Sequence, residues 1–541
     1  MKFIILIYNN FKILFNFKIK EHKVILKKIF NFISAAFELD DNLNNVKYFK
    51  LRVSLLILYL WPVILSQHVL TFQNSSSLRR IAVMTLCSAA EILFILLIVC
   101  PVIIKFFQQI DIRYEEQHNK IFIKSFLISL GVLLVYYILC YPGTFSYDPT
   151  KQYLEAISNK YTDWHPALHT LLFFTLPLKL TFGWMGSIVL LQIILFALAL
   201  AYMTEVLAYY SNYNYAYISL AFILLNPTTQ SISMSPYKDV VFAITAILLM
   251  CFALHIYYTH GAWLNNFKNI ILFSVILTLA TIFRHNAILF TAPLYLAVII
   301  YASKKHAVII FLLASLLFAF IKIPVYKYFE VEKPGYRQLE MLGVPMAVIG
   351  AAVKESPHLL DQDILDFAYK AAPKDRWQDS YITGSFNHIK FDYADKDFIE
   401  KTGAVKILKF MLKCFVQAPI ASLHGLIAET DTVYGLSGFK SDLILLNSNQ
   451  NGILSSAIVN LNHFMQVILS LFFGKIGIVN LIILICLLAK FKFKKLFFAL
   501  PLFAYNFGTM LLLAGHELRF FYYSFAIAPA LILILLNDRM N

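Results

Sequence analysis

The feature that most constrains this chain is a series of apolar stretches recurring from Leu51 to Leu536. A helix needs about 20 mostly apolar residues to cross a hydrocarbon core of roughly 30 Å, and many of these stretches are that long. The 541-residue chain is 60% hydrophobic and 14% charged. Since a soluble protein of this size must cover its surface with polar groups, we predict an all-α polytopic membrane protein instead.

About twelve of the apolar stretches are predicted to be transmembrane helices. They cover residues 51–70, 82–106, 123–141, 184–209, 214–230, 237–257, 267–283, 286–302, 306–325, 475–490, 495–514 and 519–536. Two further apolar stretches, 166–182 and 455–473, contain Pro, His or Asn. We interpret both as interfacial or re-entrant helices, because counting either one as a span would move lysine clusters to the outer side.

The positive charge of the chain is concentrated beside the ends of the predicted spans. Lysines are frequent in the first fifty residues and cluster at 304–305 and 490–495. This distribution indicates a multi-pass protein of the plasma (inner) membrane with cytoplasmic N- and C-termini. The formal net charge of +15 is therefore explained by the membrane, and a nucleic-acid partner is excluded.

The spans and the polar stretches between them divide the chain into five parts. We predict an amphipathic cytoplasmic arm (1–50), two N-terminal transmembrane helices (51–119), a transmembrane core (120–325) with a first outer loop (141–183), a mainly helical outer-face domain (326–455), and an interfacial helix followed by three transmembrane helices (456–541). The role of the two N-terminal spans stays open.

The first outer loop places a carboxylate, Asp148, close to the predicted outer interface. An acid at this depth is costly unless it faces a water-filled cavity or a cation. The alternative is that Asp148 caps the helix that follows Pro149, because Asp-Pro is a common helix start. His165 lies at the start of the next apolar stretch, in front of Pro166, and favours the functional interpretation.

Three more polar clusters occur at the outer ends of predicted spans: Lys238 with Asp239, Arg284 with His285, and His516 with Glu517 and Arg519. Each cluster alone could be an exposed hairpin tip, or side chains that reach lipid headgroups. Together they converge on one face of a bundle otherwise nearly free of charge, which favours a cavity for an anionic lipid headgroup. Arg284 and Arg519 could clamp a phosphate, and Asp148 or Asp239 could accept a proton from an attacking hydroxyl.

This order of loops, spans and polar clusters resembles the GT-C superfamily of membrane glycosyltransferases, which includes protein O-mannosyltransferases and lipid A aminoarabinose transferases. The resemblance covers roughly residues 120–540. It is strongest to a bacterial branch with a Gly-Thr-Phe-Ser-Tyr-Asp loop, a Lys-Asp hairpin, an Arg-His-Asn turn and a Glu-x-Arg near the end. It implies a polyprenyl-phosphate-linked sugar donor and inverting transfer on the outer face.

The resemblance also implies roles for individual residues. Asp148 matches the catalytic acid of the first outer loop, and Asp239 matches the second acid. Many GT-C enzymes carry paired acids in that loop, whereas Asp148 stands alone. A single carboxylate is a poor metal site, so no cofactor is expected and a divalent metal is not favoured. His165 and His169 share a helical spacing but lack a nearby third ligand.

Three functions remain open from the sequence. The favoured one is a glycosyltransferase that acts on a glycan, lipid or protein acceptor. The second is a transporter or flippase for a lipid or a polyprenyl-linked sugar. The third is a polymerase or ligase of surface polysaccharide. Against transport, no internal repeat is visible and the polar clusters lie at the ends of spans rather than at the bilayer midplane.

Overall fold

The computed structural model describes residues 45–71, 78–108, 120–333, 335, 337–436, 475–512 and 517–536. Most of the predicted arm (1–50), the predicted interfacial helix 455–473 and His516 lie outside these residues. The described residues form helices and two isolated β-bridges, with no β-strand among them. The prediction of an all-α chain is confirmed.

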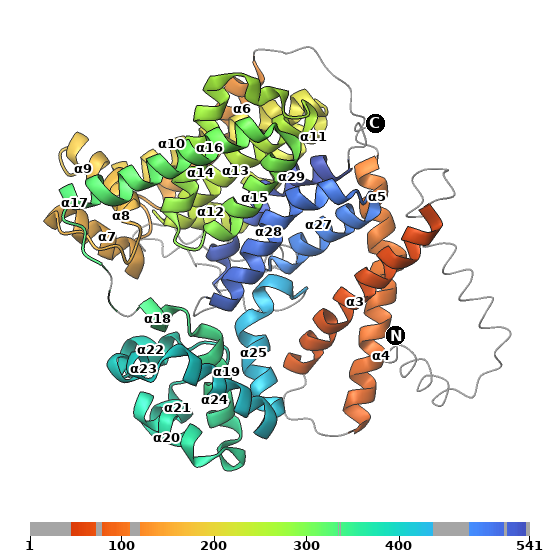
Figure 1. The fold of residues 1–541 in the computed structure, drawn as a ribbon, viewed down its shortest axis with the longest axis vertical. Helices are drawn as coiled ribbons and strands as arrows, with labels where there is room; N and C mark the ends of the chain where they lie inside the picture. Colours follow the sequence, from red (N-terminus) through yellow and green to blue (C-terminus); the bar gives the residue numbers. More distant parts are fainter. Residues whose placement is uncertain are drawn as a thin grey trace.

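A helical bundle forms the larger part of the molecule (Figure 1). Its helices are α3 (Asn45–Thr71), α4 (Leu78–Phe94), α5 (Cys100–Gln108), α6 (Ile121–Leu139), α10 (Gly186–Tyr210), α11 (Tyr213–Leu224), α12 (Pro227–Ser233), α13 (Lys238–Tyr258), α14 (Phe267–Phe283), α15 (Ile288–Tyr301), α16 (Lys304–Phe320), α27 (Gly477–Ala489), α28 (Phe493–Leu512) and α29 (Tyr523–Leu536). The π-helical turn η1 (Ile95–Val99) joins α4 to α5, and η4 (Ile321–Val325) joins α16 to α17 (Tyr326–Tyr328).

Eight helical segments of the described chain are long and apolar enough to cross a membrane. They are Arg52–Val69, Ala82–Ile104, Ile121–Leu139, Gly186–Tyr210, Lys238–Tyr258, Lys304–Tyr328, Phe493–Leu512 and Leu518–Leu536. Five shorter apolar helices accompany them, at Ala167–Leu180, Tyr213–Leu224, Phe267–Phe283, Ile288–Tyr301 and Gly477–Ala489. The predicted count of twelve spans is therefore not confirmed.

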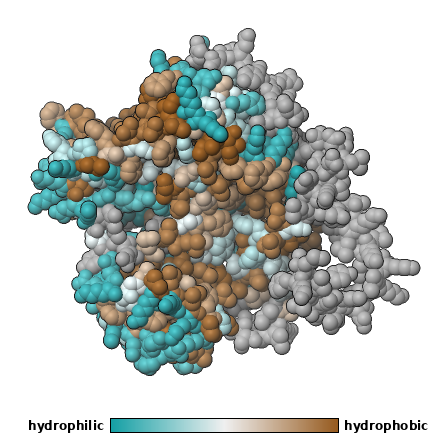
Figure 2. Space-filling model, viewed as in Figure 1, coloured by the Kyte–Doolittle hydropathy of each residue, from teal (hydrophilic) through white to brown (hydrophobic). Residues whose placement is uncertain are grey.

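The surface of the bundle is apolar where its outer helices face away from the core. α13 and α29 are almost entirely buried at its centre, whereas α16 exposes large side chains such as Phe311 and Leu316, which are 57% and 67% exposed. Figure 2 shows hydrophobic residues over the bundle and hydrophilic residues over a smaller lobe. Apolar surface of this extent is consistent with a membrane protein.

The stretch predicted as one span at 214–230 is instead two helices. α11 ends at Leu224, and α12 begins at Pro227 after a break at Asn226. Proline has no N–H to continue the helical hydrogen bonds, and the Asn226 side chain accepts from the N–H of Thr228 at 2.9 Å. The predicted re-entrant stretch 166–182 is helical as α8 (Ala167–His169), η2 (Thr170–Thr175) and α9 (Leu176–Leu180).

The smaller lobe is a separate group of short helices (Figure 1). It has a hydrophobic core of its own around Trp377. It contains α18 (Arg337–Glu340), α19 (Gly343–Glu355), η5 (Pro357–Leu359), α20 (Gln362–Ala371), α21 (Lys374–Asp379), α22 (Asn387–Asp392), α23 (Lys396–Thr402) and α24 (Ala404–Gln417). α25 (Pro419–Tyr434) packs on α19 and also contacts α3, α27 and α28, so it joins the lobe to the bundle. A Cβ at Gly425 would lie 2.6 Å from the Ala347 carbonyl oxygen, which shows how closely α19 and α25 approach.

We expect Gly384→Ala to destabilise the junction between the lobe and α25. Gly384 has φ +83°, and a Cβ there would lie 2.4 Å from the Ala428 side chain. Gly403→Ala is the matched control, because Gly403 has φ +80° but nothing within 4 Å of a Cβ. Overpacking costs about 1–3 kcal/mol, so thermal denaturation should show Gly384→Ala to be less stable than the control by about that much. Equal stability of the two variants would contradict the close packing.

Candidate active site

A cavity of about 720 Å³ lies between the bundle and the lobe, where several bundle helices begin or end. The bundle and its loops contribute Ser146, Tyr147, Asp148, Trp164, His165, Tyr237, Lys238, Arg284, His285, Asn286, Glu517, Arg519 and Phe520. The lobe contributes Glu340, Asn387, His388, Lys390, Phe391, Asp392 and Lys396. Most residues singled out in the sequence therefore meet in one place.

Asp148 lies in the first turn of α7 (Tyr147–Ser158), which follows the loop after α6. The loop is held against the chain that precedes α13: the Thr144 N–H donates to the Met234 carbonyl at 2.9 Å, and Ser146 Oγ lies 2.7 Å from the Tyr237 hydroxyl. A carboxylate in a first turn is also favoured by the helix dipole. The N-cap of α7 is Ser146 and makes no side-chain capping hydrogen bond, so the capping alternative for Asp148 is wrong, and Asp148 lines the cavity.

Arg519 is the principal partner of Asp148. It lies in the 3₁₀ turn η6 (Leu518–Phe521), and its Nη1 is 2.9 Å from Asp148 Oδ2. Its Nε also pairs with Glu517, and its guanidinium lies over the Tyr237 ring at 4.5 Å. Two carboxylates and an aromatic face fix the guanidinium plane, and Arg519 lines the cavity in this orientation.

His165 and Lys238 complete the surroundings of Asp148. Lys238 Nζ lies 3.1 Å from His165 Nδ1, and His165 Nε2 lies 4.0 Å from Asp148 Oδ1. A lysine ammonium only donates, so His165 accepts through Nδ1 and carries its proton on Nε2, on the Asp148 side. Among the described residues, no carboxylate lies within salt-bridge distance of Lys238.

These neighbours set the protonation states in the cavity. Burial raises the pKa of Asp148, but the charges of the nearby cations, above all Arg519, outweigh burial and hold its pKa well below the ordinary value of 3.8. Burial together with the charge of Lys238 lowers the pKa of His165 well below 6.5. Burial also lowers the pKa of His285. Near neutral pH the cavity therefore holds an ionised Asp148 beside neutral His165 and His285.

Asp239 does not line the cavity with Asp148. It forms an ion pair with Arg284 in which both side chains are buried, with 1% and 3% of their surface exposed. Arg284 Nε donates to Asn286 Oδ1 at 2.9 Å, and Asn286 Nδ2 donates to Thr509 at 2.6 Å. The predicted role of Asp239 as a second catalytic acid does not fit this position. We assign it to holding Arg284 in the cavity wall.

Asp163 and His169 lie near the cavity but are not part of its lining. Asp163 pairs with Lys322 at 2.9 Å, and its carbonyl lies 3.0 Å from His285 Nε2. His169 is fully buried, with Nδ1 at 2.6 Å from Gln152 Oε1 and its ring stacked on Phe173. Both are placed to support the wall, and neither lines the cavity.

The contribution of the lobe was not visible in the sequence. Asn387, His388 and Phe391 lie far along the chain from Asp148, in a stretch of ordinary soluble composition. No spacing or motif distinguishes them from other polar residues of the lobe, because their position depends on how the lobe docks. Within the described ranges, no group of three or more His, Cys, Asp or Glu side chains could hold a metal ion.

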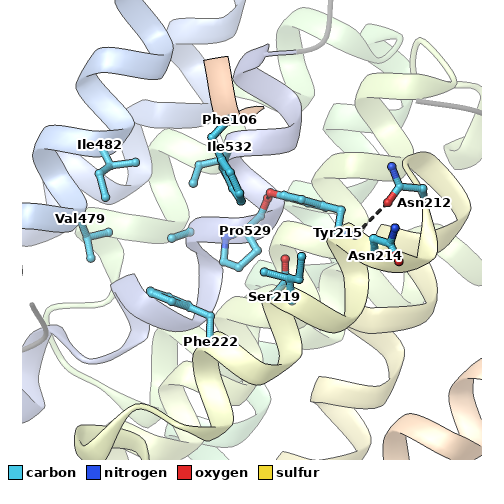
Figure 3. Close-up of a pocket in the computed structure, with 12 residues that line it drawn as sticks. Phe106, Asn212, Asn214, Tyr215, Ser219, Phe222, Val479, Ile482, Pro529 and Ile532 are labelled. Carbon is cyan, nitrogen blue, oxygen red and sulfur yellow. Dashed lines mark hydrogen bonds between the residues drawn. The ribbon is translucent and has the colours of Figure 1, made fainter. Parts of the chain in front are cut away.

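A second cavity, of about 400 Å³, has a different chemical character (Figure 3). It is lined by Phe106, Asn212, Asn214, Tyr215, Ile218, Ser219, Phe222, Val479, Ile482, Ala528, Pro529 and Ile532. The Tyr215 hydroxyl donates to the Pro529 carbonyl at 2.6 Å. This wall offers apolar contact and no charged side chain, so acid–base chemistry is assigned to the larger cavity.

Comparison of the chain with protein-family models, with curated proteins and with solved structures gives no match.

Proposed function

We propose that this protein is an inverting membrane glycosyltransferase of GT-C type that transfers a sugar from a polyprenyl-phosphate-linked donor to an acceptor hydroxyl. The observation that carries the proposal is the convergence of Asp148, Lys238, Arg284 and Arg519 on one cavity. These residues come from α7, the start of α13, the end of α14 and η6. A carboxylate beside a cluster of fixed cations suits a proton transfer next to a phosphate.

The donor phosphate is proposed to bind at Lys238 and Arg519. Among the described residues, Lys238 hydrogen-bonds the neutral His165 alone, so its charge is available to an anion. Arg519 presents a guanidinium whose fork matches two phosphate oxygens. Arg284 lines the same wall, but its side chain is buried and paired with Asp239.

Asp148 is proposed to be the general base. The acceptor oxygen forms a bond to the anomeric carbon, the bond from that carbon to the phosphate oxygen breaks, and the acceptor proton passes to Asp148. The polyprenyl phosphate then leaves as an anion beside Lys238 and Arg519. In the resting site, Arg519 makes Asp148 a weak base. A donor phosphate that competes for Arg519 raises the pKa of Asp148 and releases the carboxylate for the proton transfer.

This competition predicts two different pH profiles. The free enzyme holds Asp148 at a pKa below 3.8, so its ionised form persists until the pH falls below that value. His165 and His285 are already neutral, so we expect kcat/KM for the donor to be flat between about pH 5 and pH 8. In the donor complex the Asp148 pKa is higher, so kcat should begin to fall at a higher pH. Identical acid limbs in both profiles would contradict the competition.

The proposal places the cavity on the outer face of the plasma membrane, as the lysine distribution predicts. We expect cysteines introduced at Tyr147 and Asn387, in a Cys87→Ser background, to react with a membrane-impermeant maleimide in intact cells. A cysteine at Lys304, at the opposite end of α16 from η4, should react only after permeabilisation. Labelling of Tyr147→Cys only after permeabilisation would reverse the proposed orientation.

The activity is tested with purified protein in lipid vesicles that contain radiolabelled polyprenyl-phosphate hexoses or pentoses and a mixed acceptor pool. We expect release of polyprenyl phosphate and one product with inverted anomeric configuration. If the label moves between leaflets without release, the transporter alternative is correct. If only preassembled lipid-linked oligosaccharides are consumed, the chain is instead a polymerase or ligase.

A further inference from the structure

The cavity has two chemically different walls. The bundle wall carries the cations and the carboxylate described above. The lobe wall is formed by α18, α22 and the start of α23, and it carries amide, imidazole, carboxylate and aromatic groups together with Lys390 and Lys396. Asp148 lies on the bundle wall at α7, and α7 contacts α22 through the rings of Tyr147 and Phe391, whose centroids are 6.3 Å apart. A molecule held on α22 therefore lies next to the proposed base.

The lobe wall is held in place by a buried charge. Lys390 Nζ lies 3.0 Å from Glu340 Oε1, and the Lys390 side chain is only 3% exposed. Its two bonds to the Glu340 carboxylate fasten α22 to α18. A recognition surface on a short helix requires such support, because binding groups must be held near their productive geometry.

Two aromatic rings, Tyr147 on the bundle wall and Phe391 on the lobe wall, are unusually exposed where the two walls meet. Tyr147 is 73% exposed and Phe391 is 50% exposed, although both line a cavity. Trp164 adds a third ring. Exposed rings in a hollow offer flat apolar faces, and the C–H face of a pyranose ring is a matching partner for them.

Polar groups beside the rings match hydroxyls. Asn387 Oδ1 is buried and has no hydrogen-bond donor among the described residues, and leaving such an acceptor unpaired costs about 1–3 kcal/mol. His388 and Asp392 line the same wall. An amide, an imidazole and a carboxylate together accept from and donate to hydroxyl groups, which do both.

We propose that α22 is the acceptor-binding wall and that the acceptor is a glycan, bound with its sugar rings against Phe391 and Tyr147 and a hydroxyl on Asn387. This inference rests on the proposed function, since it names the acceptor of that reaction. A protein acceptor is the less favoured class. An extended peptide is commonly held through backbone hydrogen bonds to a strand edge, and the described part of the lobe contains no strand.

The test is a binding measurement that needs neither donor nor turnover. Fluorophore-labelled tetrasaccharides of hexoses, N-acetylhexosamines or pentoses are titrated onto the purified full chain, and anisotropy reports the Kd. We expect at least one tetrasaccharide to bind, and Phe391→Leu and Asn387→Ala to raise its Kd about tenfold or more. Tyr393→Leu is the matched control, because Tyr393 is an exposed ring two positions from Phe391 that does not line the cavity. It should leave the Kd unchanged.

Polyprenyl phosphate binding to the same variants reports whether the bundle wall is intact, and it should be unchanged in all of them. The inference is overturned if no tetrasaccharide binds, if Phe391→Leu and Asn387→Ala bind as tightly as wild type, or if labelled Ser/Thr-rich decapeptides bind through these residues instead. Tetrasaccharide binding that depends on Phe391, with no sugar transfer from any donor, would refute the proposed function and leave the glycan site standing. Sugar transfer to peptides alone would refute the glycan site and leave the proposed function standing.

Discussion

Asp148→Asn is expected to lower kcat for sugar transfer by about 10²- to 10⁴-fold, the usual contribution of a general base. The amide keeps the size of the side chain but cannot take the acceptor proton. Arg519 still pairs with Glu517 in this variant, so no buried cation is left alone and the fold should persist. The donor KM should not rise, because Arg519 no longer has to leave a carboxylate to reach the phosphate.

Glu155→Gln is the control for this experiment. Glu155 lies on the same helix, accepts from Thr162 at 2.7 Å and does not line the cavity. Its loss removes a carboxylate from α7 without touching the proposed base, so transfer should stay near the wild-type rate. Transfer by Asp148→Asn at more than about a tenth of the wild-type rate would remove Asp148 from the role of base, because even the smallest usual contribution is larger.

Asp239→Asn is expected to cost about 3–5 kcal/mol of stability, because it leaves the Arg284 guanidinium buried without its counter-ion. Arg284→Met should cost a similar amount by stranding Asp239. The double variant Asp239→Asn/Arg284→Met removes both charges and should recover most of the loss. The free energy of unfolding of the chain in detergent, from denaturant titration, measures all three.

An exposed ion pair in the lobe is the control for this series. Lys413 Nζ lies 2.7 Å from Asp363 and 3.3 Å from Asp361, and all three side chains are about half exposed. Surface pairs of this kind contribute little, so Asp363→Asn should leave stability unchanged. If the double variant were as unstable as either single one, Asp239 and Arg284 would not act as an isolated pair. If Asp239→Asn kept full stability but lost transfer, the catalytic role predicted for Asp239 would be restored.

The two acids show how far sequence reasoning could go. Asp148 follows the end of one apolar stretch, and Asp239 lies at the start of another. Both belong to polar clusters at the same predicted depth in the membrane. Only side-chain packing separates them, because Asp239 faces Arg284 across the bundle interior while Asp148 faces the cavity. The break at Asn226–Pro227 is different, because the sequence itself contains the signal for it. The predicted span 214–230 nevertheless runs through this proline.

The lobe shows most clearly what could not be predicted from the sequence. Its helical character agrees with the predicted outer-face domain, but the six residues of α22 carry no sequence signal of a binding wall. Their role depends on the Lys390–Glu340 pair and on the contact of Phe391 with Tyr147. Contacts between residues so far apart in the chain depend on how whole helices dock, which no local pattern specifies.

By itself, the sequence determined the class of the protein and the end of the helices where its polar groups gather. Both follow from local properties: the length of an apolar stretch decides whether it suits a membrane, and charge avoids the hydrocarbon core and collects at helix ends. Only the tertiary structure decided which acid faces the cavity, which acid pairs with each arginine, and that the lobe supplies a second wall. Those outcomes depend on distances of a few ångströms between distant segments, because electrostatic and hydrogen-bond partners are chosen by packing.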